Sequence, residues 1–125
     1  MFNELCRFAI LFWICWLGTL TWAATANQDG PVTYSGEIMD SLCAKDGSHE
    51  KMMNEMKSMG RDKQTCAQKC IQLGAKYVLF DPVKKTIYDL DDQDRAAGFA
   101  GHRVQVKGTL EKKKIKVSSI ELIDQ

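Results

Sequence analysis

This sequence lacks an excess of charge of either sign: 17 lysines and arginines stand against 16 aspartates and glutamates in 125 residues, a formal net charge of +1. Such near-neutrality argues against a dedicated binder of nucleic acid or of anionic membranes. The chain also lacks a serine–histidine–aspartate order, a phosphate-binding glycine loop and any pair of carboxylates in a catalytic context. The sequence therefore favours a binding module over an enzyme.

Long hydrophobic runs are absent except near the N-terminus, where residues 8–22 are uncharged and rich in Phe, Ile, Leu and Trp. The small residues of Ala24-Thr25-Ala26 follow, a pattern typical of a signal-peptidase site. We expect residues 1–26 to be a cleaved signal peptide and residues 27–125 to form one exported domain, periplasmic or extracellular. The alternative is an uncleaved membrane anchor, because residues 8–26 are just long enough to span a bilayer.

The polar and apolar residues of the remaining chain alternate in two periods, one typical of strands and one of helices. Strands are expected at 32–39, 76–81, 86–90, 103–110 and 115–122, and helices at 49–59, 63–73 and 91–100. Without the first two helices this is the element order of an OB barrel. We therefore predict an α+β fold: a five-stranded OB-like β-barrel with a two-helix insertion between strands 1 and 2 and a short helix between strands 3 and 4.

Two positions interrupt the expected strands. Gly36 lies inside the first strand, where a glycine suggests a bulge or a tight barrel corner. In the last strand, Ile115 and Val117 have the opposite parity to Ile120 and Leu122. A bulge near residues 118–119 would place both pairs on the same side of the sheet.

Histidine is scarce, with two in the whole chain, and the expected mature domain contains an odd number of cysteines. Cys43, His49, Cys66 and Cys70 follow one another with the spacing C-x5-H-x16-C-x3-C. An oxidising compartment favours cysteines that are paired or bound to metal, and one disulfide leaves a third thiol over. A C-x-x-C pair, which is typical of thioredoxin-like redox sites, is absent from this set.

A metal site is one interpretation of these four residues. Cys66 and Cys70 are one helical turn apart, so their parallel side chains are poorly placed for a disulfide but well placed to bind one metal. With Cys43 and His49 they make a Cys3His set, which suits zinc. Copper(I) is the alternative metal, because thioether donors lie close by in the sequence, at Met52, Met53 and Met56.

A disulfide is the other interpretation. Cys43 would bridge to Cys66 or Cys70, which would stabilise the fold by about 3 kcal/mol on the chain-entropy model. The domain would then be a non-catalytic scaffold that binds a protein or carbohydrate partner through the barrel face, where Tyr77 and Tyr88 lie on neighbouring strands. In either case a monomer is expected, no nucleic acid is expected as a partner, and membrane contact is expected only if the N-terminal segment is uncleaved.

Several short motifs carry a resemblance to a known group of proteins. They are Gly36-Glu37-Ile38-Met39-Asp40-Ser41-x-Cys43-Ala44, His49, Cys66-x3-Cys70, Gly74-Ala75-Lys76-Tyr77-Val78, and Phe99-Ala100-Gly101-His102-x-Val104-x-Val106-x-Gly108-Thr109. Together they resemble a family of small exported bacterial OB-like domains of unknown function. The resemblance implies an OB-like barrel in which the cysteine–histidine set is a shared feature. It implies no established substrate or activity.

Overall fold

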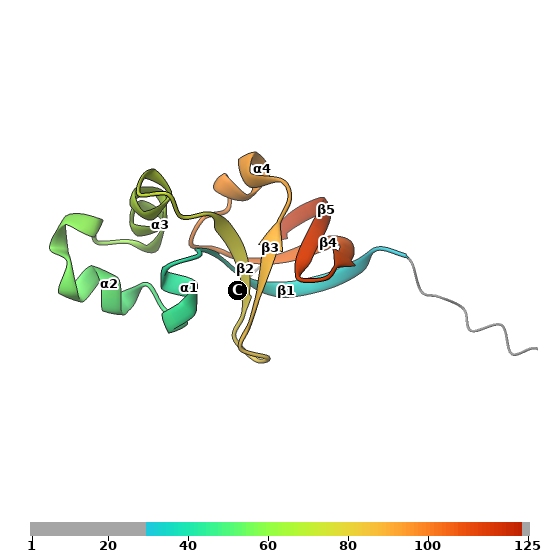
Figure 1. Ribbon diagram of the computed structural model, residues 1–125, viewed down its shortest axis with the longest axis horizontal. Coiled ribbons are helices and arrows are strands. Elements are labelled where there is room, and N and C mark those ends of the chain that lie inside the picture. Colours follow the sequence, from blue (N-terminus) through green and yellow to red (C-terminus); the bar gives the residue numbers. More distant parts are fainter. Residues whose placement is uncertain (1–29, 124–125) are drawn as a thin grey trace, which may run out of the picture.

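The computed structural model describes residues 30–123, and the expected signal peptide lies outside that range. Five strands and several short helices follow one another along the chain (Figure 1). They are β1 (Val32–Asp40), α1 (Cys43–Asp46), α2 (Glu50–Glu55), the 3₁₀ turn η1 (Lys57–Met59), α3 (Lys63–Gln72), β2 (Tyr77–Asp81), β3 (Thr86–Leu90), α4 (Gln93–Ala97), β4 (Arg103–Glu111) and β5 (Lys114–Leu122). The predicted α+β class with five strands is confirmed.

The strands form one mixed sheet that closes on itself in the order β1-β2-β3-β5-β4. β1 takes part twice, because its first part pairs with β4 and its last part, from Glu37 to Asp40, pairs with β2. Gly36 lies where the partner changes, and a Cβ atom at this position would come within 2.4 Å of the Phe80 carbonyl oxygen. Gly36 therefore permits the close approach of the β1 and β2 backbones at the point where β1 changes partner.

The predicted bulge in β5 is also present. Lys107 of β4 lies opposite Ser119, whereas the next residue, Gly108, lies opposite Val117, so that Ser118 is the extra residue. This bulge allows Ile115 and Ile120, which differ in parity, to enter the same buried core. A short parallel contact between the end of β3 and the start of β5 completes the closed sheet.

The main core lies inside the closed sheet. Its buried members are Ile38, Ala67, Tyr77, Leu79, Leu90, Ala96, Ala100, Val104, Val106, Ile115 and Ile120. The helix α4 closes one end of this core, and its Gln93 amide both accepts from the Tyr77 backbone N–H at 2.8 Å and donates to the Tyr77 carbonyl oxygen at 2.9 Å. Among residues 30–123, no helix combines the length and the apolar character needed to cross a bilayer.

The helices between β1 and β2 lie together at one end of the sheet (Figure 1). The expected helix at 63–73 is confirmed as α3, but the expected helix at 49–59 is interrupted. It ends at Glu55, and Met56 leaves the helical conformation before η1 begins. The physical reason is that α2 buries none of its residues, so tertiary packing does little to hold a longer helix. A further helical turn, α1, forms between β1 and α2, where no helix was expected.

Candidate metal centre

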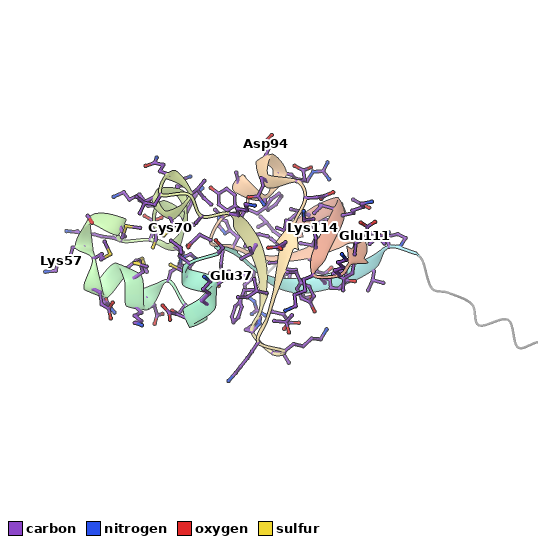
Figure 2. All side chains as sticks on the ribbon, viewed as in Figure 1. Glu37, Lys57, Cys70, Asp94, Glu111 and Lys114 are labelled. Atoms are coloured by element: carbon purple, nitrogen blue, oxygen red, sulfur yellow. The ribbon has the colours of Figure 1, made fainter. Side chains whose placement is uncertain are left out.

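Three thiols converge where the helical insertion meets the sheet. Cys43 opens α1, and Cys66 and Cys70 lie one turn apart on α3, the helix on which Figure 2 marks Cys70. Each of the three residues is at most 1% exposed, and their sulfur atoms all lie within 4.8 Å of one another. All three are free cysteines. The alternative in which Cys43 forms a disulfide with Cys66 or Cys70 is therefore not the arrangement found.

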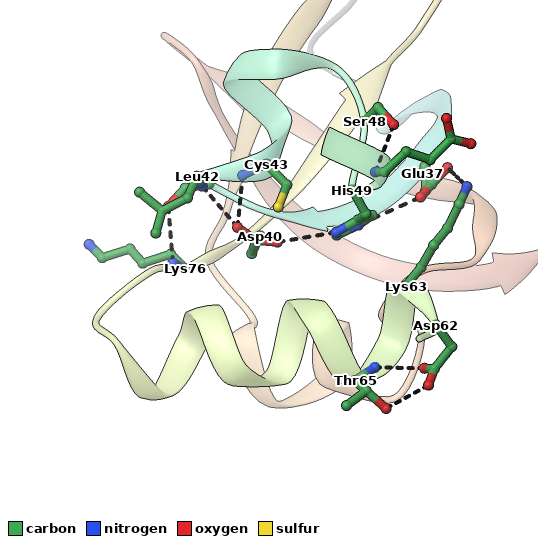
Figure 3. Close-up of polar contacts among 12 residues, drawn as sticks. Glu37, Asp40, Leu42, Cys43, Ser48, His49, Asp62, Lys63, Thr65 and Lys76 are labelled. Carbon is green, nitrogen blue, oxygen red and sulfur yellow. Dashed lines mark hydrogen bonds and ion pairs between the residues drawn. The ribbon is translucent and has the colours of Figure 1, made fainter. Parts of the chain in front are cut away.

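His49 is fully buried immediately before α2, between two carboxylates. Its Nδ1 atom lies 3.4 Å from the Asp40 Oδ2 atom, and its Nε2 atom lies 3.7 Å from the Glu37 Oε1 atom (Figure 3). Neither ring nitrogen makes a hydrogen bond. His49 is also the residue that immediately precedes the first turn of α2, and the neighbouring Ser48 Oγ atom accepts a hydrogen bond from the Glu50 backbone N–H.

Asp40 ends β1 and turns the chain into α1. Its Oδ1 atom accepts hydrogen bonds from the backbone N–H groups of Leu42, at 3.0 Å, and Cys43, at 2.9 Å. This capping arrangement leaves the Oδ2 atom free to face His49, and the whole side chain is inaccessible to solvent. One carboxylate therefore both positions the Cys43 thiol and adds an oxygen donor to the site.

Asp40 is a site residue that was not predicted from the sequence. An aspartate three residues before Cys43 has the spacing of a helix cap, and this was the available signal. It was not used because no helix was expected to begin near Cys43. Asp40, Cys43 and His49 each offer an atom within 4.8 Å of the others, so they form a second triad that shares Cys43 with the three-sulfur triad.

The four ligands predicted from the sequence are thus divided between two overlapping groups. Cys43, Cys66 and Cys70 come together as expected, and His49 joins Cys43 and Asp40 instead. Within residues 30–123, the four predicted residues are not found as one group with all ligand atoms inside 4.8 Å. The His49 Nδ1 atom instead faces the Asp40 carboxylate, at 3.4 Å from its Oδ2 atom.

Burial controls the protonation of this cluster. Desolvation raises the pKa of the Cys70 thiol to about 12, and repulsion from Asp40 adds to the effect. The pKa values of Cys43 and Cys66 are raised for the same first reason. Desolvation lowers the pKa of His49, although Asp40 and Glu37 oppose that change. At neutral pH without a cation, the thiols and the imidazole are therefore neutral.

An ion pair closes the outer side of the cluster. Lys63, the first residue of α3, donates to the Glu37 Oε2 atom at 2.9 Å, which ties the helix to β1 (Figure 3). The Glu37 side chain is 17% exposed, whereas the side chains of His49 and Asp40 are inaccessible to solvent. The other carboxylate oxygen of Glu37 faces the histidine.

Methionines supply much of the apolar wall around the thiols. Met39 and Met59 are buried in the same cluster as the three cysteines, together with Ala44 and Val78. Met52 and Met53 pack against it as partly buried residues. Met56 is 47% exposed, so of the three thioethers considered as donors for copper(I), only Met52 and Met53 pack against the cluster.

The aromatic residues considered for partner binding through the barrel face are largely part of the core. Tyr77 is buried within it, and Tyr34 and Tyr88 pack against it with their ring centroids 5.3 Å apart. Comparison of the chain with protein-family models, with curated proteins and with solved structures finds no match. The chemistry of the cysteine cluster is therefore the main indication of function.

Proposed function

We propose that this chain is an exported binding module that holds a thiophilic metal ion, zinc or copper(I), through Cys43, Cys66 and Cys70, with His49 completing the donor set. The observation that carries the proposal is the convergence of three free, buried sulfur atoms within 4.8 Å. Tetrahedral Zn–S bonds of about 2.3 Å place sulfur atoms about 3.8 Å apart, so sulfur atoms that all lie within 4.8 Å of one another are close enough to share one ion with little rearrangement.

Chemistry supports a metal over three unligated thiols. Thiolate is the form that binds metal, and it is the softest donor that a protein offers. Burial disfavours the thiolate only while no cation is present, because a bound ion supplies the opposite charge. In an exporting, oxidising route, bound metal would also keep the sulfur atoms from pairing.

We propose further that the closed sheet is an OB-like barrel carrying a helical insertion. The strand order β1-β2-β3-β5-β4 and the helix α4 between β3 and β4 support this assignment. The resemblance to small exported OB-like domains is consistent with it. Its first motif contains Gly36 at the corner of β1, the site carboxylates Glu37 and Asp40, and the shared ligand Cys43. A family that keeps this motif would keep the site.

A combined thiol and metal count tests this proposal. The full chain is purified with Cys6→Ser and Cys15→Ser, so that every remaining thiol belongs to the cluster. Thiols are counted in denaturant with chelator and without reductant, and metal is measured on the untreated sample. We expect three thiols together with bound zinc or copper. One thiol and no metal would contradict the proposal and would support the alternative scaffold in which Cys43 forms a disulfide.

A further inference from the structure

We propose that the cluster binds two divalent ions of zinc-like chemistry, bridged by the Cys43 thiolate. One ion lies on the sulfur side, with Cys66 and Cys70, and the other lies on the mixed side, with Asp40 and His49. This inference rests on the proposed function, and it replaces one four-ligand site by two sites with a common ligand. It also favours zinc over copper(I).

The geometry of the two triads is the first argument. Each triad offers three ligand atoms within 4.8 Å of one another, and Cys43 belongs to both. A thiolate sulfur has more than one lone pair and bridges two metal ions readily, as an imidazole nitrogen cannot. Cys43 is therefore the residue type that a shared corner requires. The three sulfur atoms alone are soft donors, whereas Asp40 and His49 add the oxygen and nitrogen donors that zinc also accepts.

Unpartnered buried atoms are the second and independent argument. Within residues 30–123, the buried side-chain nitrogen and oxygen atoms without a hydrogen-bond partner are Glu37 Oε1, Asp40 Oδ2, His49 Nδ1 and His49 Nε2. All of them lie on the mixed side. Leaving such a group buried and unpaired is unfavourable, because it loses its water without gaining a partner. An ion bound to Asp40 Oδ2 and His49 Nδ1 would satisfy two of these atoms together.

The same ion explains the other two atoms. Once Nδ1 binds metal, the proton of His49 sits on Nε2, which faces the Glu37 Oε1 atom at 3.7 Å. A carboxylate in that position orients a metal-bound imidazole and fixes its tautomer. Lys63 holds Glu37 in place through its ion pair at 2.9 Å. A single ion bound only to the three sulfur atoms leaves these groups as they are.

Charge is the third argument. With the thiols deprotonated by metal, three thiolates and Asp40 carry four negative charges in residues that are at most 1% exposed. Lys63 already compensates Glu37. Uncompensated buried charge is costly, and one divalent ion would leave half of it in place. Two divalent ions neutralise the cluster, whereas two copper(I) ions would not.

Counting ions in the intact protein tests the inference. The Cys6→Ser/Cys15→Ser chain is loaded with Zn²⁺ and analysed by native mass spectrometry, and a second sample is loaded with ¹¹³Cd²⁺ for NMR. We expect two ions per chain and two cadmium resonances, one typical of a sulfur-rich site and one of a mixed site. One ion with a single resonance would overturn the two-ion inference and leave the proposed function standing. No bound ion would overturn both.

Variants assign each ion to its side. His49→Ala is expected to lower the count from two to one and to remove the resonance of the mixed site, whereas Cys66→Ser is expected to remove the sulfur-rich resonance. Met56→Leu changes an exposed thioether on the same insertion and is the matched control. It should keep both ions and both cadmium resonances. If His49→Ala keeps two ions, the mixed site is wrongly assigned. The number of ions bound by the Cys6→Ser/Cys15→Ser chain tests the two-ion inference even if a further variant fails to fold.

Discussion

His49 Nδ1 lies 3.4 Å from Asp40 Oδ2, and neither side chain is exposed to solvent. A buried histidine and a buried aspartate at this separation normally complete a hydrogen bond, yet both atoms remain unpartnered. Both also lie beside the Cys43 thiol. An ion between them accounts for this arrangement, since nitrogen, oxygen and sulfur donors would then face one centre.

Asp40 has two separable roles, and substitutions distinguish them. Asp40→Asn keeps an oxygen to cap the Leu42 and Cys43 N–H groups, so we expect it to retain most of the apo stability while losing the charge that binds metal. Asp40→Ala loses the cap as well and should cost about 1–2 kcal/mol more in urea unfolding. Equal stabilities of the two variants would show that the cap contributes nothing.

Asp62 provides the matched control for Asp40. It caps α3 through the Thr65 N–H and hydroxyl groups at 2.8 Å, on the solvent-exposed side of that helix. Asp62→Ala should therefore lower the stability slightly, through loss of the cap, and leave the metal content unchanged. Loss of metal from this variant would mean that metal content follows general stability and not the donor atoms.

Metal binding should release protons. The buried thiols are protonated at neutral pH because their pKa values are raised, to about 12 for Cys70, and they bind metal as thiolates. We expect about three protons to be released at pH 7 when the cluster is filled, and the apparent affinity to rise with pH. Calorimetry in buffers of different ionisation enthalpy measures the number directly. Release of no protons would exclude thiolate ligation.

The metal-free domain should lose stability at alkaline pH. Below the ordinary thiol pKa of 9.0, thiols are protonated in both folded and unfolded chains; between 9.0 and about 12, the unfolded chain loses protons that folded Cys70 retains. Each such thiol then lowers the free energy of unfolding by about 1.4 kcal/mol per pH unit. Urea unfolding in chelator should show this fall, with a shallower slope for Cys70→Ser. Identical slopes would contradict the burial of that thiol.

Gly36 should not tolerate a side chain. A Cβ atom would come within 2.4 Å of the Phe80 carbonyl oxygen, and that backbone cannot move without disturbing the pairing of β1 with β2. We expect Gly36→Ala to cost about 1–3 kcal/mol, because overpacking forces the backbone apart. Gly30→Ala, with no atom within 4 Å of its Cβ, should be close to neutral. Thermal unfolding of the two variants makes the comparison.

Patterns local in sequence predicted most of the fold. Strand alternation located β3 at its observed limits, and the change of parity after Val117 located the bulge at Ser118. The break at Met56 was not predictable from periodicity. The helix α2 buries no residue, so little packing holds a longer helix, and periodicity does not report how much packing a helix makes. Sequence indicates which residues alternate, and tertiary contacts decide how far each element extends.

The site was predicted in part for a similar reason. Helical phase placed Cys66 and Cys70 on one inward face, and the structure adds Cys43 to them. The helical pattern did not predict that Asp40 would lie beside His49, since that contact depends on how the end of β1 meets the start of α2. A carboxylate that caps a turn looks the same in sequence whether or not its second oxygen reaches a buried histidine.

X-ray absorption at the metal edge of the purified, untreated chain is the most direct test of the central claim that this cysteine cluster binds metal. The account predicts sulfur neighbours at about 2.3 Å, with lighter nitrogen or oxygen neighbours at about 2.0–2.2 Å. Cys43→Ser, at the ligand common to both triads, should lower the number of sulfur neighbours per metal ion. A spectrum with only nitrogen and oxygen neighbours, or a chain free of metal with Cys43 in a disulfide, would contradict it.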